Sequence, residues 1–448
     1  MGTVTSQSGL KDLGEGLFLR RATVADTETL VTFHADMHRD PGVEEPDEWI
    51  GAWVRDLMTK AHPTFDLDDF LVVEDGETGE IVSSVALISQ TWSYGGIEFG
   101  VGRPELVATH PDYRRRGLVR AQFEMIHQRS AERGEMMQAI TGIPWYYRQF
   151  GYEMGLCLGG RRAGYGAQVP TLKEGEEELY RFRPARAGEW PILAQAYEYG
   201  TKRSLVACVR DEAQWLNELE GKHRINVNRR ELRVIEDQRG DPVGMLAHSA
   251  RLWRNGIAAS RYELLPGHSW LAVTPAVIGY LWSTGETWAA ADEGQEMEVF
   301  RLNLGAEHPA YEACQDRLPA THPAYAWYVR VPDLPGFLRH VAPVLERRLA
   351  GSLAVGYGGQ LKVSFYRDGL RLVFADGRLK EIAPWQPTTE EEGDAAFPDL
   401  TFLQLLFGYR SLDELAEARA DCWAANDAAR VVLDSVFPKQ ISDVWPLS

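Results

Sequence analysis

The stretch ELVATHPDYRRRGLVRAQFE, from Glu105 to Glu124, decides the fold of the first part of the chain. Its opening residues, Glu105 to Thr109, are predicted to form a strand. A turn that begins with a proline and a basic loop with a single glycine, Gly117, come next. This loop opens directly into an amphipathic helix, predicted from about Leu118 to Arg133. A strand, a basic glycine loop and a helix in direct succession are typical of a site that binds phosphate groups.

The physical basis of such a site is the start of the helix. The first N–H groups of a helix have no partner within it, and the helix dipole adds positive potential there. Gly117 would let the backbone approach a pyrophosphate closely, and the loop and first turn add positive charge. The basic residues are Arg114, Arg115, Arg116 and Arg120. The alternative is an ordinary helix start decorated with solvated arginines.

Segments on the N-terminal side of this stretch also mix strands and helices. A short apolar strand beginning at Leu17 leads to capping residues, Thr23 to Asp26, in front of a helix. The segment from Phe70 to Leu87 is predicted to be two strands joined by a turn at Gly76 to Gly79. We therefore expect an α+β fold with mixed sheets.

The same layout recurs farther along the chain. Leu19–Ala22 (LRRA) resembles Phe182–Ala185 (FRPA), 163 positions later, and the VVED motif at residues 72–75 resembles VIED at residues 234–237, 162 positions later. A third match pairs residues 109–111 with residues 273–275, at an offset of 164. Three matches at nearly one offset indicate duplication of a whole domain. The second copy has no arginine cluster, so we expect no phosphate site there.

The chain changes character from about Ala324. A strand is followed by a helix whose apolar residues, from Phe337 to Leu345, recur at helical spacing. The segment LKVSFYRDGLRLVF is predicted to be a hairpin with an Asp-Gly turn, and a broken helical region covers Leu400 to Val436. These elements indicate a third, α+β domain. Gly164 to Glu178 and Glu307 to His322 are interpreted as linkers.

Composition restricts the class of protein. The net charge of −18 argues against binding to nucleic acid and favours cationic partners such as amines, although acidity can also serve solubility alone. The four cysteines are scattered and form no metal-binding pattern. The N-terminus lacks a signal-peptide pattern, and the most apolar stretch, Trp270 to Trp282, is too short to cross a membrane. We expect a cytoplasmic protein without a metal.

The basic loop resembles the cofactor motif of the GNAT acetyltransferases, Arg/Gln-x-x-Gly-x-Gly/Ala. Here it reads Arg114-x-x-Gly117-x-Val119, with Val in place of the final small residue. The run RRRGLVRA and the segment YYRQFGYE, from Tyr146 to Glu153, are similar to the enhanced intracellular survival family of that superfamily. The resemblance implies a catalytic GNAT domain (residues 1–163), a degenerate GNAT-like domain (164–322) and a domain like sterol carrier protein (323–448).

The resemblance also implies roles for individual residues. Tyr147 would be the general acid that protonates the departing thiolate of coenzyme A. The backbone around the pantetheine arm of acetyl-CoA and the amides around its pyrophosphate would come from three short segments. These cofactor-binding residues are Val107, Ala108 and Thr109, then Arg115, Arg116, Gly117, Leu118, Val119 and Arg120, and finally Gly142 and Ile143.

The base that accepts the amine proton has several candidates. In the resembled family it is the carboxylate at the end of the chain, which here belongs to Ser448. This tail ends in VWPLS and lacks the terminal Phe of that family. Glu105 and His110 lie near the predicted cofactor strand and are alternatives, although each could equally be a strand or turn residue without a chemical role.

We therefore expect an acetyl-CoA-dependent N-acetyltransferase. It would act by direct attack in a ternary complex on a primary amine, such as an aminoglycoside, a polyamine or a lysine side chain. The resemblance further implies a homo-oligomer, a hexamer. Two other classes remain: a protein that holds coenzyme A without turnover, and a lipid-binding protein dominated by its C-terminal domain.

Overall fold

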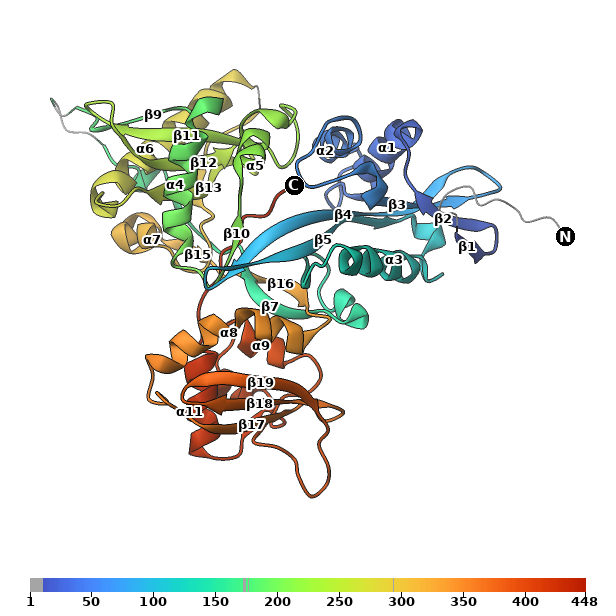
Figure 1. Cartoon of the computed structure of the whole chain (residues 1–448). Coiled ribbons are helices and arrows are strands. Elements are labelled where there is room, and N and C mark those ends of the chain that lie inside the picture. Colours follow the sequence, from blue (N-terminus) through green and yellow to red (C-terminus); the bar gives the residue numbers. More distant parts are fainter. Residues whose placement is uncertain (1–10, 172–174, 176, 293) are drawn as a thin grey trace.

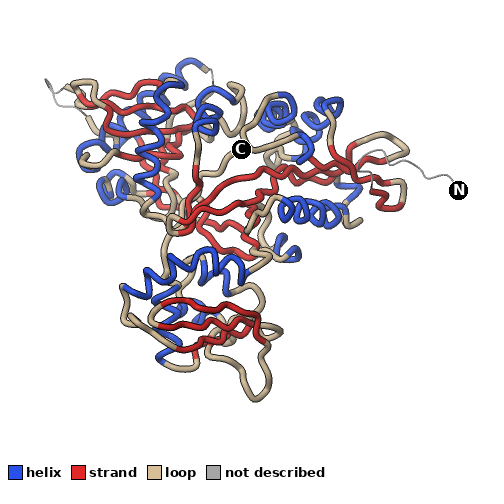
Figure 2. Tube along the Cα trace, in the orientation of Figure 1, coloured by secondary structure: helices blue, strands red, loops and turns tan. Residues whose placement is uncertain are grey.

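The computed structural model describes residues 11–171, 175, 177–292 and 294–448. These residues form three sheets, each with its own helices, in a three-lobed arrangement with the first sheet in the middle (Figure 1). We call each sheet with its helices the first, second and third unit. Helices and strands alternate through all three units (Figure 2), so the predicted α+β fold with mixed sheets is confirmed.

The first unit is built on a nine-stranded sheet in the order β1-β2-β3-β4-β5-β6-β16-β7, with β10 paired to β4. Its strands are β1 (Lys11–Gly14), β2 (Leu17–Arg21), β3 (Phe70–Asp75), β4 (Ile81–Tyr94), β5 (Ile97–Thr109), β6 (Met137–Ile140), β7 (Glu153–Leu158), β10 (Val206–Val209) and β16 (Tyr325–Arg330). Its helices are α1 (Thr27–Met37), α2 (Glu48–Thr59) and α3 (Leu118–Glu132).

Helices cover both faces of this sheet. Successive side chains of a strand point to opposite faces, and in the central strands the side chains on both faces are apolar. On β3, Phe70 and Val72 are buried in one cluster with residues of α1 and α2, whereas Leu71 and Val73 are buried in another cluster with residues of α3. The central strands are therefore apolar on both sides. This burial fixes α3, and the loop in front of it, against the middle of the sheet.

The second unit has a seven-stranded sheet in the order β15-β8-β14-β13-β12-β11-β9. Its strands are β8 (Arg161–Tyr165), β9 (Tyr180–Pro184), β11 (Arg230–Asp237), β12 (Pro242–Ser249), β13 (Gly256–Leu264), β14 (Val299–Leu302) and β15 (Ala320–His322). Its helices are α4 (Trp190–Thr201), α5 (Glu212–Leu216), α6 (Trp270–Ala291) and α7 (Pro309–Ala313). No helix in the described part of the chain is long and apolar enough to span a membrane.

The first and second units share one layout. In both, four antiparallel strands (β2-β3-β4-β5 and β9-β11-β12-β13) are followed by a strand parallel to the last, β6 or β14. Even an ion-pair cluster repeats: Arg20 pairs with Asp26 and Glu74, and Arg183 pairs with Glu189 and Glu236. The LRRA and VVED matches thus correspond in space. The third match is wrong, because Val273–Pro275 lies inside helix α6 whereas residues 109–111 form a strand end and a turn.

The third unit combines a five-stranded sheet with four helices. Its strands are β17 (Gly359–Ser364), β18 (Gly369–Ala375), β19 (Arg378–Trp385), β20 (Ala395–Ala396) and β21 (Trp423–Ala424). Its helices are α8 (Leu334–Ala350), α9 (Phe402–Leu406), α10 (Leu412–Ala418) and α11 (Asp427–Val436). The apolar residues of α8, from Phe337 to Leu349, belong to one buried cluster that continues into Trp92 and Phe99 of the first sheet. The third unit therefore packs directly on the first.

Several strands cross the predicted domain limits. β16, expected in the third domain, lies in the first sheet between β6 and β7, and β10 of the second segment pairs with β4. β8 spans the limit at residue 163 and belongs to the second sheet. The interpretation of Glu307 to His322 as a linker is wrong, because it holds α7 and β15 and buries Tyr311. Part of the other predicted linker, residues 172–174 and 176, lies outside the described residues.

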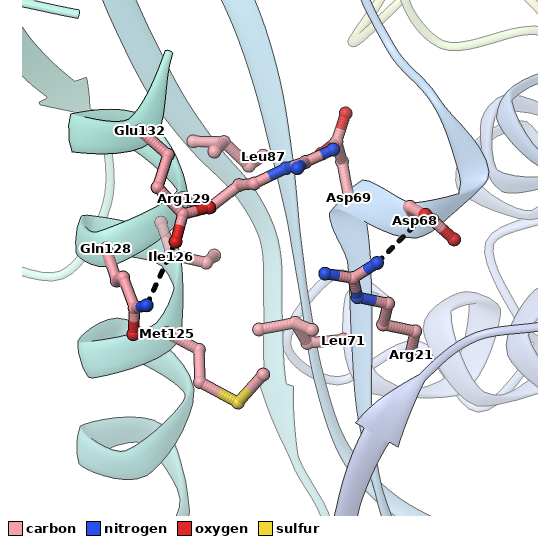
Figure 3. A pocket seen from close by; sticks show the side chains of 10 residues that line it. All are labelled: Arg21, Asp68, Asp69, Leu71, Leu87, Met125, Ile126, Gln128, Arg129 and Glu132. Atoms are coloured by element: carbon pink, nitrogen blue, oxygen red, sulfur yellow. Dashed lines mark hydrogen bonds and ion pairs between the residues drawn. The ribbon is translucent and has the colours of Figure 1, made fainter. Parts of the chain in front are cut away.

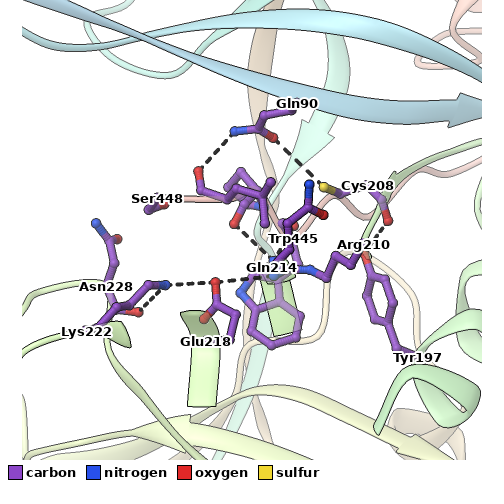
Figure 4. A network of polar contacts seen from close by, with 12 residues as sticks. Gln90, Tyr197, Cys208, Arg210, Gln214, Glu218, Lys222, Asn228, Trp445 and Ser448 are labelled. Atoms are coloured by element: carbon purple, nitrogen blue, oxygen red, sulfur yellow. Dashed lines mark hydrogen bonds and ion pairs between the residues drawn. The ribbon is translucent and has the colours of Figure 1, made fainter. Parts of the chain in front are cut away.

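The last twelve residues, Phe437 to Ser448, form a C-terminal tail that runs back into the junction between the first and second units (Figure 4). The guanidinium of Arg210 donates to the carbonyl oxygens of Trp445 and Pro446 at 2.9 and 3.2 Å, and it lies 4.1 Å from the ring centre of Trp445. Arg210 is fully buried and is balanced by Glu218, which also accepts from Lys222. The tail is thus an internal component of the fold.

Replacing the Trp445 side chain is expected to destabilise the protein strongly. Trp445 is 8% exposed and packs edge-on against Tyr197 and Trp215. Removing a buried aromatic ring and leaving a cavity costs about 3–5 kcal/mol, so Trp445→Ala should lower the free energy of unfolding by that amount in denaturant titrations followed by circular dichroism. The control Trp253→Ala, at a ring that is 42% exposed, should cost less than about 1 kcal/mol. Equal losses would contradict the structural role of the tail.

Candidate functional site

The candidate site lies where two parallel strands separate. β5 and β6 pair through Val101 with Met137 and Gly102 with Gln138, and both strands then continue. Past this point the residues of β5 and those that follow β6 line opposite sides of one cavity of about 880 Å³. The lining residues on β5 run from Pro104 to Thr109, and those on the β6 side run from Ile140 to Ile143. Beyond their last paired residues, the two neighbouring strands thus border a ligand-sized space.

A β-bulge in β5 shapes this wall. The register between β4 and β5 shifts between Ser84 and Ala86, and Leu106 adopts a left-handed conformation with φ of 52°. Such a conformation is unfavourable for a leucine, but its side chain is buried among the residues of α1 and α2. The bulge re-aims the backbone of the next residues, Val107 to Thr109, which line the cavity.

The basic loop forms the far end of the cavity. Arg115 and Gly117 are both left-handed, with φ of 64° and 77°, and Gly117 is the N-cap of α3. The first-turn amides of α3, from Leu118 to Arg120, have no partner within the helix. A Cβ on Gly117 would meet no atom within 4 Å, so the backbone here borders open space. The combination is an anion-binding helix start.

The arginines of the loop differ in where they point. Arg114, Arg115 and Arg120 line the cavity, and Arg120 also donates to the side-chain oxygen of Gln149 at 3.1 Å. The Arg116 side chain is outside the lining, because its guanidinium stacks over the Tyr113 ring at 4.9 Å and pairs with Glu15. Arg116 can therefore contribute its backbone amide to the loop, but its side-chain charge is directed elsewhere.

Tyr147 lies in the wall of the same cavity, on the short helical turn η4 (Tyr146–Phe150). Its ring is 5% exposed and stacks on Phe123 of α3 at 5.8 Å. A Cβ on Gly142, whose φ is 145°, would be 2.9 Å from this ring, so glycine is needed for the close approach. Burial, and then the nearby carboxylate of Glu105, raise the pKa of Tyr147. The phenol is therefore held in its protonated form.

Glu105 connects the cavity to the C-terminal tail. Its carboxylate lines the cavity and pairs with Arg103, and burial raises the pKa of Glu105. Arg103 in turn donates to the carbonyl oxygen of Leu447 at 2.7 Å and to the hydroxyl of Ser448 at 3.3 Å. Ser448 itself is not among the lining residues. The chain end is thus separated from the cavity by the Arg103–Glu105 pair.

The other sequence-based candidate base, His110, is outside the lining. It caps the turn η3 (Pro111–Tyr113), where its Nδ1 accepts from the amide of Asp112 at 3.4 Å. Sequence reasoning missed residues that do line the cavity, above all Met37 and His38 at the end of α1. Nothing in the local pattern of α1 marks them, because only the packing of this helix beside β5 brings them to the site.

A second, smaller cavity of about 100 Å³ lies between α3 and the sheet (Figure 3). Its charged residues are engaged with one another: Arg21 with Asp68, and Arg129 with Asp69. A space of this size holds a few waters. It is therefore a poor candidate for a substrate site, and the larger cavity is the better one.

Comparison with known proteins places the larger cavity in a recognised domain. Residues 19–155 match the family model Acetyltransf_9, an acetyltransferase (GNAT) domain. No curated protein matches the sequence. A GCN5-related N-acetyltransferase from Kribbella flavida has a TM-score of 0.63 at 18% identity, covering 98% of this chain and 99% of that chain.

Two further solved structures resemble the chain. Eis1 from Mycobacterium abscessus has a TM-score of 0.55 at 16% identity, with 94% of this chain and 98% of that chain covered. Saccharomyces cerevisiae N-myristoyltransferase with bound myristoyl-CoA has a TM-score of 0.53 at 12% identity, with 73% and 81% covered. At these identities the likeness shows the fold. The first unit therefore contains a GNAT acetyltransferase domain, and the arrangement of the whole chain resembles that of GNAT proteins.

The contact between Gly142 and Tyr147 gives a stability test of the site. Gly142→Ala should lower the free energy of unfolding by about 1–3 kcal/mol, because its φ disfavours a side chain and the added Cβ presses on the Tyr147 ring. The matched control is Gly279→Ala, within helix α6, where a Cβ meets no atom within 4 Å. This control should gain about 0.5–1 kcal/mol. Denaturant titrations of both variants decide, and a neutral Gly142→Ala would contradict the described packing.

Proposed function

We propose that this protein transfers the acetyl group of acetyl-CoA to a primary amine, in a ternary complex held by the larger cavity. One observation carries the proposal. A single cavity joins an anion-binding helix start, the open ends of β5 and β6 and the buried phenol of Tyr147. These are the features that an acyl-CoA transferase needs: a place for phosphates, a channel for the thioester arm and a proton donor for the leaving thiolate.

The fit to acetyl-CoA follows from the chemistry of the lining groups. The amides from Arg115 to Arg120 would hold the pyrophosphate, aided by the side chains of Arg115 and Arg120. The backbone of Val107 to Thr109 on one side, and of Gly142 and Ile143 on the other, would hold the pantetheine arm. Backbone N–H groups of Val107 to Thr109, which follow the Leu106 bulge, would stabilise the oxyanion that forms when the amine attacks.

Tyr147 is assigned as the general acid. In the transfer the amine nitrogen bonds to the acetyl carbon, the carbon–sulfur bond breaks, and the phenol donates its proton to the sulfur. Because burial and the Glu105 carboxylate raise the pKa of Tyr147 above its usual value of about 10, the phenol keeps its proton as the pH rises. Deprotonation of Tyr147 should therefore not lower kcat between about pH 7 and pH 10.

The acceptor is assigned to the cationic amines, such as polyamines, aminoglycosides or lysine side chains. The segment from Asp40 to Glu48 directly follows the cavity residue His38 and contains five acidic residues: Asp40, Glu44, Glu45, Asp47 and Glu48. Of these, Asp47 lies close enough to the cavity residue His38 to influence its pKa, and acidic groups near a site raise the local concentration of a cationic substrate.

Other expectations from sequence remain predictions. The carboxylate of Ser448 stays a candidate base that would act through the Arg103–Glu105 pair, and the likeness of the third unit to sterol carrier protein and the assembly of six chains are untested. In the second unit, helix α6 follows β13 without a basic loop and begins at Trp270 after Ser269. Its proposed role is to pack against the catalytic unit and to bury the C-terminal tail.

Release of free thiol from acetyl-CoA, with a panel of aminoglycosides, polyamines and lysine peptides, tests the proposal. The wild type should release thiol with at least one amine, and acetylated product should appear in equal amount by mass spectrometry. Tyr147→Phe should lower kcat by about 10²–10⁴-fold, the usual contribution of a general acid, with little change in the affinity for acetyl-CoA.

The matched control is Tyr199→Phe, at an exposed tyrosine of α4, which should retain wild-type kcat. A wild-type protein that binds acetyl-CoA and acetylates no amine would favour the non-catalytic alternative. Equal activity of Tyr147→Phe and the wild type would remove the general-acid role from Tyr147.

A further inference from the structure

A buried chain of hydrogen bonds leads from the wall of the larger cavity into the sheet. His38 lines the cavity at the C-terminal end of α1. Its Nδ1 lies 3.2 Å from the carbonyl oxygen of His34 and 3.3 Å from the Nδ1 of His34. The Nε2 of His34 lies 2.9 Å from the hydroxyl of Ser84 on β4, and this hydroxyl donates to the carbonyl of Leu106 at 3.5 Å.

One arrangement of the hydrogens satisfies every contact in this chain. A carbonyl oxygen can only accept, so the Nδ1 of His38 carries the hydrogen and donates to His34. At the other end, Ser84 gives its hydrogen to the Leu106 carbonyl and accepts from the Nε2–H of His34. The Nδ1 of His34 is then free to accept from His38. In this arrangement, with both imidazoles neutral, the Nε2 of His38 keeps its lone pair.

This lone pair has no hydrogen-bond partner among the described residues of the chain, and the ring that carries it lines the cavity. The remaining candidate bases are occupied or displaced. Glu105 pairs with Arg103, Ser448 is behind that pair, and His110 caps a turn outside the lining. Of these groups, only His38 both lines the cavity and is free of an ion pair among the described residues.

We propose that His38 is the general base of the transfer and accepts the proton of the acceptor amine on its Nε2. This assignment rests on the proposed acetyl transfer. His34 and Ser84 are positioning residues, because they hold the tautomer and the ring through hydrogen bonds and would not touch the substrate. They also tie the base to Leu106, the bulge residue next to the backbone proposed to bind the thioester.

The proton balance of the step is complete. The acceptor first gives its ammonium proton to solvent. The neutral amine then attacks the acetyl carbon and its nitrogen passes one proton to the Nε2 of His38, while Tyr147 gives one proton to the sulfur. The products are the N-acetyl amine and free coenzyme A. The cationic imidazole and the phenolate that remain are reset by one net proton transfer from His38 to Tyr147 through solvent in the cavity.

Burial of His38 disfavours its cationic form. Burial is the main cause that lowers the pKa of His38, whereas the His34 carbonyl and the carboxylate of Asp47 at the start of α2 oppose it. The pKa of His34 is lowered well below its usual value by burial and then by His38. An imidazole that is unprotonated before the amine arrives is ready to act as a base.

The first test is independent of activity. Long-range nitrogen–proton NMR of the full-length protein with ¹⁵N-labelled histidine reports the tautomer of each ring at pH 7. The proposal requires hydrogen on Nδ1 and a bare Nε2 for His38, assigned through His38→Gln, and hydrogen on Nε2 for His34. A His38 ring that is cationic, or that carries its hydrogen on Nε2, would overturn the assignment.

The second test is kinetic. His38→Ala should lower kcat by about 10²–10⁴-fold while acetyl-CoA affinity is unchanged, and added imidazole should restore part of the rate in proportion to its unprotonated form. A merely structural role would give no such rescue. His268→Ala, at an exposed histidine of the second unit, is the matched control and should keep wild-type kcat.

The outcomes separate the two proposals. Two outcomes contradict the role of His38 and leave the proposed function standing. In one, the wild type transfers acetyl groups and His38→Ala is fully active. In the other, a folded His38→Ala variant loses activity that imidazole does not restore. Absence of transfer by the wild type with every amine contradicts the proposed function, and the role of His38 with it. A variant truncated after Leu447 that loses as much activity as His38→Ala and responds to no imidazole would assign the base to the chain end.

Discussion

The structure of the site depends on the separation of β5 from β6. Two parallel strands normally satisfy each other's backbone groups, but here both run on past their last pair, Gly102 with Gln138. The left-handed Leu106 bulge helps to hold one strand away, and the buried Leu106 side chain anchors it against α1 and α2. Everything proposed about function uses the backbone that this separation leaves facing the cavity.

Parts distant in sequence pack around the strands that form this opening. β16 closes the far side of β6, and α8 adds a core that is continuous with the first sheet. The C-terminal tail fills the junction with the second unit, where Arg210 binds its carbonyl groups and Arg103 binds Leu447. The second and third units therefore pack against the first unit, even though the basic loop and Tyr147 both come from the first 150 residues.

The sequence predicted those features that depend on local pattern. The α3 helix, the β3–β4 and β17–β18 hairpins and the glycine-capped basic loop follow from periodicity, glycine and charge within short windows. It could not predict that Tyr325–Arg330 joins the first sheet, because a strand's partner is chosen by long-range packing. For the same reason it missed His38 at the end of α1. The proposed role of His38 depends on a hydrogen-bond chain that reaches Ser84 and Leu106 on other elements.

The opening between β5 and β6 is proposed to receive the arm of coenzyme A. A crystal structure of the protein grown with coenzyme A would show where the ligand binds. The pyrophosphate should lie on the amides from Arg115 to Arg120, the pantetheine arm between Val107–Thr109 and Gly142–Ile143, and the thiol beside Tyr147. Coenzyme A bound elsewhere, for example at the start of α6, or β5 and β6 closed into a continuous pair with the ligand excluded, would contradict this proposal.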